Sequence, residues 1–217
     1  MELYAHPFSS YCQKVLVALY ENAIPFEFRM LSPEHAQNMD ELARLWPLRR
    51  MPVLVDGSRT VFESSIIIDY LDQHHRGPVR WLPDSPDAAM EVRMLDRFFD
   101  QYVLTTMQRI VADYLRPAEH RDAYGVAEGR KLLDSAYAWL EPTLAGREWA
   151  AGGAFTLADC AAAPSLFYAD WVHPIPDARG NVRAYRNRLL ARPSFARAVD
   201  EARPYRPLFP PGAPDRD

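Results

Sequence analysis

The sequence predicts an α/β domain followed by an all-helical domain. In the first third of the chain, short β-rich runs alternate with helical patterns, and after three closely spaced prolines every pattern has helical spacing. We therefore expect an α/β domain over residues 1–77, a linker over residues 78–86, and a helical bundle domain over residues 87–217 that ends in a proline-rich tail.

The first domain is expected to alternate strands and helices. "ELYA" is a short strand, and the apolar residues after Pro7 recur at helical spacing. "FEFRML" alternates as a strand does, and "EHAQNMDELARLW" suits a helix that ends before Pro47. This βαβ order begins a small mixed sheet with helices on its faces.

A hairpin and a helix complete this domain. Two short strands, Val53–Val55 and Thr60–Phe62, are joined by Asp56-Gly57, the strongest short hairpin signal in the sequence. "SSIIIDYLDQHH" follows as a helix that ends before Gly77.

Two long helices are expected at the start of the second domain. An apolar stripe predicts one continuous helix over residues 86–115, about 40 Å long at 1.5 Å per residue. The stripe consists of Val92, Leu95, Phe99, Tyr102, Met107, Ile110 and Tyr114. A second helix is expected over residues 123–144.

Shorter helices follow. In "FTLADCAAAPSLFYADW", Thr156 at the N-cap and Asp159 three residues later form a variant of the capping box, which we assign to folding and not to catalysis. Two further helices are expected near residues 182–190 and 194–202. The final stretch, "RPYRPLFPPGAPDRD", is too rich in proline for regular structure.

Composition restricts the class of protein. The sequence is 48% hydrophobic and 25% charged with a net charge of -4, which is ordinary globular composition and gives no electrostatic reason to expect a nucleic-acid or anionic-membrane partner. The only cysteines, Cys12 and Cys160, suggest a reducing compartment. Because the start has no signal-peptide pattern and no apolar run is long enough to span a membrane, we expect a cytoplasmic protein. His74-His75 lack the spacing of metal ligands, so no metal site is expected.

Four motifs together resemble the cytosolic glutathione S-transferase family. They are "SSYCQKV" after the first strand, "MPVLVDG" at the third, "FESSIIIDYL" at the start of a helix, and "FTLADCAAAP" in the helical half. They occur in the family's order over the whole sequence up to the proline-rich tail, and they are similar to its serine-type bacterial classes. The resemblance implies a thioredoxin-like N-terminal domain that binds glutathione, a helical domain that supplies most of the second-substrate pocket, and a homodimer.

The resemblance places the glutathione thiol at the start of the first helix. A free thiol has a pKa near ~8.5, so an enzyme must lower that pKa to obtain the thiolate at neutral pH. Ser9 matches the family's catalytic serine, and its hydroxyl and the helix dipole would stabilise the thiolate. Ser10 is the competitor, because one residue of helix rotation exchanges the two, and both could instead be simple N-caps. Cys12 matches the second cysteine of a CxxC pair and is assigned to packing, with a mixed disulfide to glutathione as the alternative.

The resemblance also implies where the rest of glutathione binds. The backbone of Met51 would pair with the cysteine of glutathione, and Pro52 would shape the site as the cis-proline of thioredoxin-like folds. Glu63 and Ser64, at a strand-to-helix junction, suit the ammonium and carboxylate of the γ-glutamyl group.

Two further regions are implied less directly. Arg50 would reach the glycine end of glutathione, a role that Arg49 could fill instead. The second substrate is expected between the domains. Its pocket would be lined by Phe8 and Tyr11, by the inner face of the long helix with Tyr102, Thr106, Met107 and Tyr114, and by Trp171.

These residues lead to the hypothesis of a glutathione transferase in which the Ser9-stabilised thiolate attacks an electrophilic, largely apolar substrate. One alternative uses the same thiolate for isomerisation, lyase chemistry or dehalogenation, although Tyr11 replaces the cysteine of the "SSC" sequence in zeta-type isomerases. Another alternative is a non-catalytic ligand-binding or protein-interaction module, against which the retained glutathione residues argue.

Overall fold

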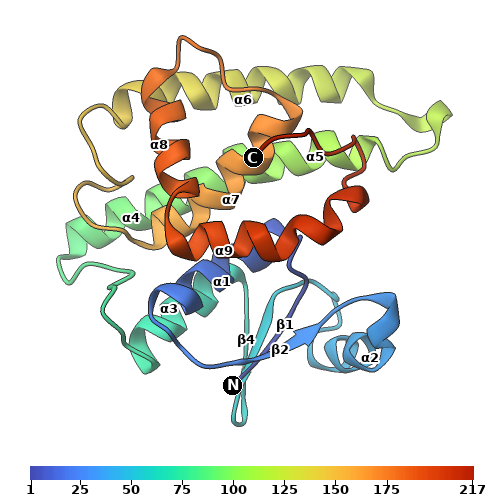
Figure 1. Cartoon of the computed structure of the whole chain (residues 1–217), viewed down its shortest axis with the longest axis vertical. Helices are drawn as coiled ribbons and strands as arrows, with labels where there is room; N and C mark the ends of the chain where they lie inside the picture. The colour runs from blue at the N-terminus through green and yellow to red at the C-terminus, as the bar shows by residue number, and fades with distance from the viewer.

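The computed structural model describes residues 1–217, and its N-terminal part is a four-stranded mixed sheet (Figure 1). The strands are β1 (Glu2–Ala5), β2 (Glu27–Met30), β3 (Val53–Asp56) and β4 (Arg59–Phe62), in the order β2-β1-β3-β4. β1 pairs in parallel with β2 and antiparallel with β3, which in turn pairs antiparallel with β4. The βαβ and hairpin units expected from the sequence are confirmed.

Helices α1 (Ser10–Glu21), α2 (Ala36–Leu45) and α3 (Ser64–His74) cover this sheet. Because side chains alternate along a strand, β1 buries Leu3 and Ala5 in the large core with α1 and α3. Tyr4 points to the opposite face and packs with Leu42 of α2. The first face of the sheet therefore joins the helical domain, and the second is covered by α2 alone.

The hairpin between β3 and β4 has the expected turn. Gly57 has a φ of +58°, in the left-handed region that glycine adopts without steric cost. Each strand differs from its predicted bounds by one residue at one end.

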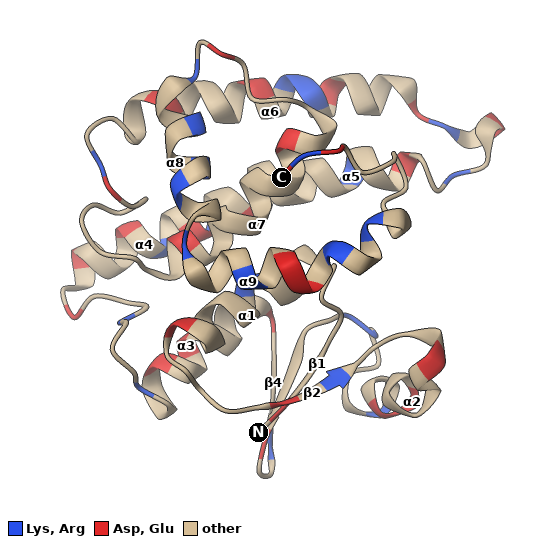
Figure 2. Cartoon of the chain, viewed as in Figure 1, with Lys and Arg blue, Asp and Glu red and all other residues tan.

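The C-terminal part is all helical. It contains α4 (Pro86–Phe98), the π-helical segment η2 (Phe99–Leu104), α5 (Thr105–Asp113), α6 (Ala123–Thr143), α7 (Leu157–Val172), α8 (Gly180–Leu190) and α9 (Pro193–Ala202), with short 3₁₀ turns at Pro33–His35 (η1), Ala118–His120 (η3) and Arg203–Leu208 (η4). Helix α7 is buried along nearly its whole length and packs against α1 and α4, so one continuous core crosses both domains (Figure 1). Basic and acidic residues are interspersed along the helices of both domains (Figure 2). No helix has both the length and the apolar character needed to span a membrane.

The prediction of one regular helix over residues 86–115 was wrong in its geometry. A π-helical segment interrupts it and adds a residue to the turn, which rotates the following residues relative to a regular α-helix. Phe99 and Ile110 are buried as the stripe predicts, but Tyr102 is 48% exposed and Tyr114, beyond the end of α5, is 41% exposed.

The prediction of an irregular tail was wrong for residues 203–208 and correct for residues 209–217, which form no helix or strand. Residues Arg203–Leu208 form the 3₁₀ segment η4, and Phe209 is buried against Phe8, Tyr168 and Trp171. The Asp217 carboxylate pairs with Arg203 at 2.6 Å. Burial of the Phe209 ring and this ion pair hold in place a segment whose local composition favours no regular structure.

The capping box at the start of α7 is confirmed. The backbone N–H of Thr156 donates to Asp159 Oδ2 at 2.8 Å. Asp159 Oδ1 accepts from the N–H of Ala150 at 2.8 Å and the hydroxyl of Tyr185 at 2.6 Å, so this buried carboxylate is fully hydrogen-bonded. Its role is to fix the loop before α7 and the packing of α8.

Candidate active site

A cavity of about 590 Å³ lies where the N-terminal ends of α1 and α3 face η2 and α5. The structure brings to it every residue that the resemblance assigns to glutathione: Ser9, Arg50, Met51, Pro52, Glu63 and Ser64. The rest of the lining comes from both domains and consists of Tyr11, Trp46, Arg49, Arg97, Asp100, Gln101, Thr105 and Gln108. We call this the first cavity.

The two candidate serines differ in position. Ser9 is the N-cap residue of α1, yet its side chain makes no capping hydrogen bond, and it lines both the first cavity and a second, neighbouring one. Ser10 is 6% exposed, lines only the second cavity, and accepts a 3.4 Å hydrogen bond from Gln108 Nε2. Of the two hydroxyls, only Ser9 therefore borders the first cavity at the positive end of the helix dipole.

Cys12 is fully buried in α1. Burial raises the pKa of its thiol to about 11, against a smaller opposing effect of hydrogen bonding from Ser9. A thiol with this pKa is not a nucleophile at neutral pH, so the geometry matches a packing role.

Met51 and Pro52 form the wall next to Ser9. The peptide bond between them is cis, as the resemblance implies. The backbone N–H and C=O of Met51 form no hydrogen bond with another backbone group, so both can bind an extended ligand beside β3.

Glu63 has an unusual backbone conformation at the start of α3. Its φ is +64°, in the left-handed region that residues other than glycine rarely adopt. Its exposed carboxylate makes no capping hydrogen bond, and Ser64 is the buried first residue of the helix. Such strain is characteristic of functional sites, and here it places a carboxylate beside the N–H groups of a helix N-terminus.

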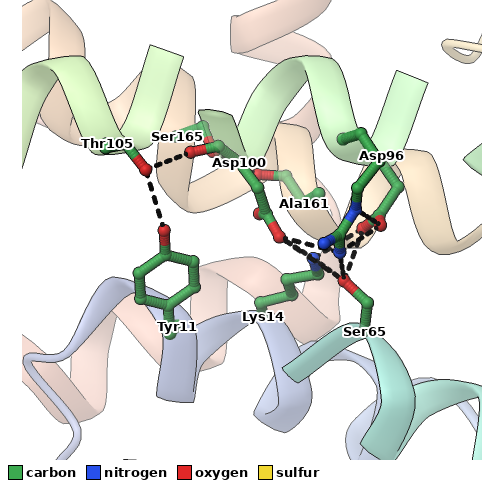
Figure 3. A network of polar contacts seen from close by, with 9 residues as sticks. Tyr11, Lys14, Ser65, Asp96, Asp100, Thr105, Ala161 and Ser165 are labelled. Atoms are coloured by element: carbon green, nitrogen blue, oxygen red, sulfur yellow. Dashed lines mark hydrogen bonds and ion pairs between the residues drawn. The ribbon is translucent and has the colours of Figure 1, made fainter. Parts of the chain in front are cut away.

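A buried polar network joins the two domains next to the first cavity (Figure 3). Lys14 of α1 is fully buried, and its Nζ donates to Ser65 Oγ at 2.8 Å, Asp96 Oδ1 at 2.5 Å and Asp100 Oδ2 at 2.8 Å. Arg97 contributes a second cation, 2.8 Å from Asp96 Oδ2 and 3.3 Å from Asp100 Oδ2. Burial raises the pKa of Asp100, and the positive charge of Lys14 acts in the opposite direction.

A second link lies beside this network. The hydroxyls of Tyr11 and Thr105 are 3.3 Å apart, and the Thr105 hydroxyl donates to the backbone C=O of Asp100 at 2.8 Å (Figure 3). Sequence reasoning missed the network, although a lysine within the apolar face of α1 and two aspartates four residues apart on the long helix were available signals.

The second cavity, of about 290 Å³, differs in chemistry because no charged residue lines it. Of the residues predicted for the second substrate, Phe8 and Met107 lie here, and Tyr11 lies in the first cavity. The remaining lining consists of Ser9, Ser10, Gln108, Val111, Ala112, Leu115, Tyr168, Leu208, Phe209 and Pro210.

Four predicted residues lie outside both cavities. Tyr102 and Tyr114 are exposed for the reasons given above, and Thr106 is 2% exposed and borders a separate cavity between α5 and α6. Trp171 packs behind the wall, against Phe8 and Phe209.

Sequence reasoning also missed the far wall of the second cavity. The spacing of Met107, Val111 and Leu115 at four-residue intervals was a signal for one helix face. The tail residues, Leu208 to Pro210, gave no such signal. No group of three or more histidine, cysteine, aspartate or glutamate residues is placed to hold a metal ion.

Comparisons with known proteins agree with this architecture. Residues 3–79 match the model of the glutathione S-transferase N-terminal domain, and residues 104–193 match that of the C-terminal domain. The protein is similar to a glutathione S-transferase from Methylobacterium radiotolerans whose crystal structure contains glutathione sulfonate. The two sequences are 30% identical, the structures superpose with a TM-score of 0.77, and the match covers 91% of this sequence and 93% of that one. It is 27% identical to the stringent starvation protein A homolog of Coxiella burnetii over 93% of this sequence and 92% of that protein. It is also 27% identical to the glutathione S-transferase GstB of Escherichia coli K12, over 88% of this sequence and 93% of that protein.

The fold is thus a thioredoxin-like domain followed by a helical domain, with a polar cavity at their junction. The protein belongs to the glutathione S-transferase family.

Proposed function

We propose that the protein is a glutathione transferase that binds glutathione in the first cavity and activates its thiol at Ser9. The observation that carries this proposal is the convergence, in one cavity, of Ser9, Met51-Pro52 and Glu63-Ser64 from three separate segments of the sequence. The similar Methylobacterium structure supports the proposal, because it is a complex with a glutathione analogue, glutathione sulfonate.

The charges of the first cavity suit a tripeptide with two carboxylates and one ammonium group. The Glu63 carboxylate would bind the γ-glutamyl ammonium, and the N-terminus of α3 with Ser64 would bind the neighbouring carboxylate. Met51 would pair with the cysteine through its backbone, and Arg50 or Arg49 would bind the glycine carboxylate.

Activation of the thiol requires stabilisation of its anion. A hydrogen bond from the Ser9 hydroxyl and the dipole of α1 both favour the thiolate, and two pKa units correspond to about 2.7 kcal/mol. The thiolate then donates an electron pair to the electrophilic carbon, so that a C–S bond forms and the leaving group departs with its bonding electrons. Because the lining of the second cavity is mostly apolar and has no charged residue, the second substrate is expected to be largely apolar and uncharged.

The matched variants Ser9→Ala and Ser10→Ala test this assignment. We expect Ser9→Ala to raise the pKa of bound glutathione, measured from the ultraviolet absorbance of its thiolate, and to lower turnover of 1-chloro-2,4-dinitrobenzene on the order of a hundredfold. Ser10→Ala should change both much less. An unchanged thiol pKa in Ser9→Ala would falsify the proposed role of Ser9.

A second candidate function is a non-catalytic ligand-binding or protein-interaction module, because the name of the stringent starvation protein A homolog, similar over nearly the whole of both sequences, states no transferase activity. Calorimetry with glutathione, together with the turnover assay above, separates the two functions. Binding of glutathione with turnover supports the transferase, whereas the absence of measurable binding supports the module.

We also propose that the protein forms a homodimer through α3 and α4. Large apolar residues are exposed on these helices, with Ile66 at 55%, Met90 at 64% and Met94 at 53%. The two helices are neighbours, because the side-chain oxygens of Ser65 and Asp96 are 3.1 Å apart, and the exposed residues could together form one interface. Sedimentation at micromolar concentration should give a dimer, and Met94→Lys should shift it toward monomer. A monomeric wild-type protein would contradict this assembly.

A further inference from the structure

Two residues line both cavities, and they come from different domains. They are Ser9 at the start of α1 and Gln108 on α5. If glutathione occupies the first cavity with its sulfur at Ser9, the boundary between the cavities is where the sulfur meets the second substrate. Gln108 is therefore the residue of the helical domain that borders the reacting atoms.

The amide of Gln108 is available to a ligand. The residue is exposed, and its one side-chain hydrogen bond is the 3.4 Å contact from Nε2 to Ser10 Oγ, at the long end of the normal range. An amide nitrogen carries two N–H donors, so at least one has no partner within the protein.

Of the other polar side chains of the second cavity, that of Tyr168 is held in place. The Tyr168 hydroxyl accepts a 3.0 Å hydrogen bond from Gln13 Nε2 and lies 3.5 Å from the backbone C=O of Phe8. Apart from the two serines, Gln108 is thus the polar group of this cavity that can turn toward a substrate.

We propose that Gln108 is a specificity-determining residue, which donates a hydrogen bond to an oxygen of the second substrate next to the carbon that the sulfur attacks. This inference rests on the proposed transferase function. It assigns the preferred substrates to compact, uncharged electrophiles that carry such an oxygen, for example aryl halides with an ortho nitro group, rather than to simple hydrocarbon halides. A cavity of about 290 Å³ is at the lower end for small-molecule sites and suits one substituted ring.

The chemistry of a nitroaryl halide shows why the donor matters. The thiolate donates an electron pair to the ring carbon that carries chlorine, and the ring electrons move onto the ortho nitro oxygens. These electrons then return to the ring and expel chloride, which leaves a thioether. A donor at the nitro oxygens stabilises charge that is larger in the addition complex than in the free substrate.

The variant Gln108→Met removes the amide and keeps a side chain of similar length. We expect it to lower kcat/KM for 1-chloro-2,4-dinitrobenzene about tenfold and for benzyl chloride, which has no oxygen, less than twofold. The control Gln73→Met makes the same substitution at an exposed position of α3, where the amide bonds only to Asp69, and should alter neither value. Equal losses for both halides, or no loss for either, would overturn the proposal.

A binding experiment decides the proposal even if turnover is absent. Calorimetry should show that Gln108→Met weakens S-(2,4-dinitrophenyl)glutathione about tenfold and S-benzylglutathione little, whereas unchanged affinity for both contradicts the role of Gln108. Glutathione itself should bind wild type and variant alike. If the wild-type protein binds no glutathione, the proposed function fails first and this inference is overturned with it.

Discussion

The first and second cavities share Ser9 and Gln108 but are built in different ways. The first is polar, and its lining from the N-terminal domain comes from loop ends and helix starts, where backbone N–H groups and charged residues gather. The second is mostly apolar and is lined by one face of α5 and by the C-terminal tail. The part of the first cavity made from loop ends and helix starts carries the short motifs on which the family resemblance rests, whereas the second cavity depends on how distant segments meet.

The largest loss of stability is expected when the buried polar network of Lys14, Asp96 and Asp100 beside the first cavity is broken. Lys14→Met leaves the buried carboxylates of Asp96 and Asp100 without their main cation and should destabilise the protein by about 3–5 kcal/mol in urea unfolding. The control Lys131→Met, at a side chain that is 73% exposed, should change stability by less than about 0.5 kcal/mol. Similar losses in both variants would mean that the network does not stabilise the junction of the two domains.

A smaller effect is expected at the tail wall of the second cavity. Phe209→Ala removes a ring that is 7% exposed and should lower the free energy of unfolding by about 2 kcal/mol. It should raise KM for 1-chloro-2,4-dinitrobenzene and leave the affinity for glutathione unchanged. Leu208→Ala, at a residue that is 61% exposed in the same wall, should hardly change stability. If Phe209→Ala weakened glutathione binding equally, the two cavities would not be functionally separate.

A more modest effect is expected at the arginines of the first cavity. Each is exposed, so loss of one charge should raise the dissociation constant of glutathione only a few-fold in calorimetry. We expect Arg50→Ala to have the larger effect and Arg49→Ala the smaller. The reverse order would assign the glycine carboxylate to Arg49.

The smallest effect on function is expected at Cys12, whose thiol should be unreactive in the folded protein. Its pKa is raised from 9.0 to about 11, so its contribution to stability is complete below about pH 9 and is lost as the pH rises through about 11. At pH 8 the folded protein should therefore resist alkylation by iodoacetamide at Cys12, whereas protein unfolded in urea should react, as peptide mapping can measure. Rapid labelling of the folded protein would make Cys12, and not only glutathione, a candidate reactive sulfur.

Which site residues could be predicted from the sequence depends on whether they belong to local motifs or to contacts between distant segments. Ser9, Met51-Pro52 and Glu63-Ser64 were assigned through the resemblance to the family, and that resemblance is carried by short local motifs: a helix start, a proline before a strand and a strand-to-helix junction. Lys14, Asp96 and Asp100 were not, because their pairing joins two domains over long sequence separations. Tyr102 and Tyr114 were placed in the pocket because a regular helical repeat was assumed where the backbone forms a π-helical turn.

By itself, the sequence determined the order of strands and helices, the division into two domains, the turn at Asp56-Gly57 and the capping box at Thr156. These depend on periodicity and on residues within a few positions of one another. Only the tertiary structure decided which face of the long helix borders the second cavity, that the proline-rich tail closes it, and that Lys14 lies between two aspartates. The physical reason is that burial and ion pairing are properties of residues brought together in space, and local propensity carries no information about a partner that lies far away in the sequence.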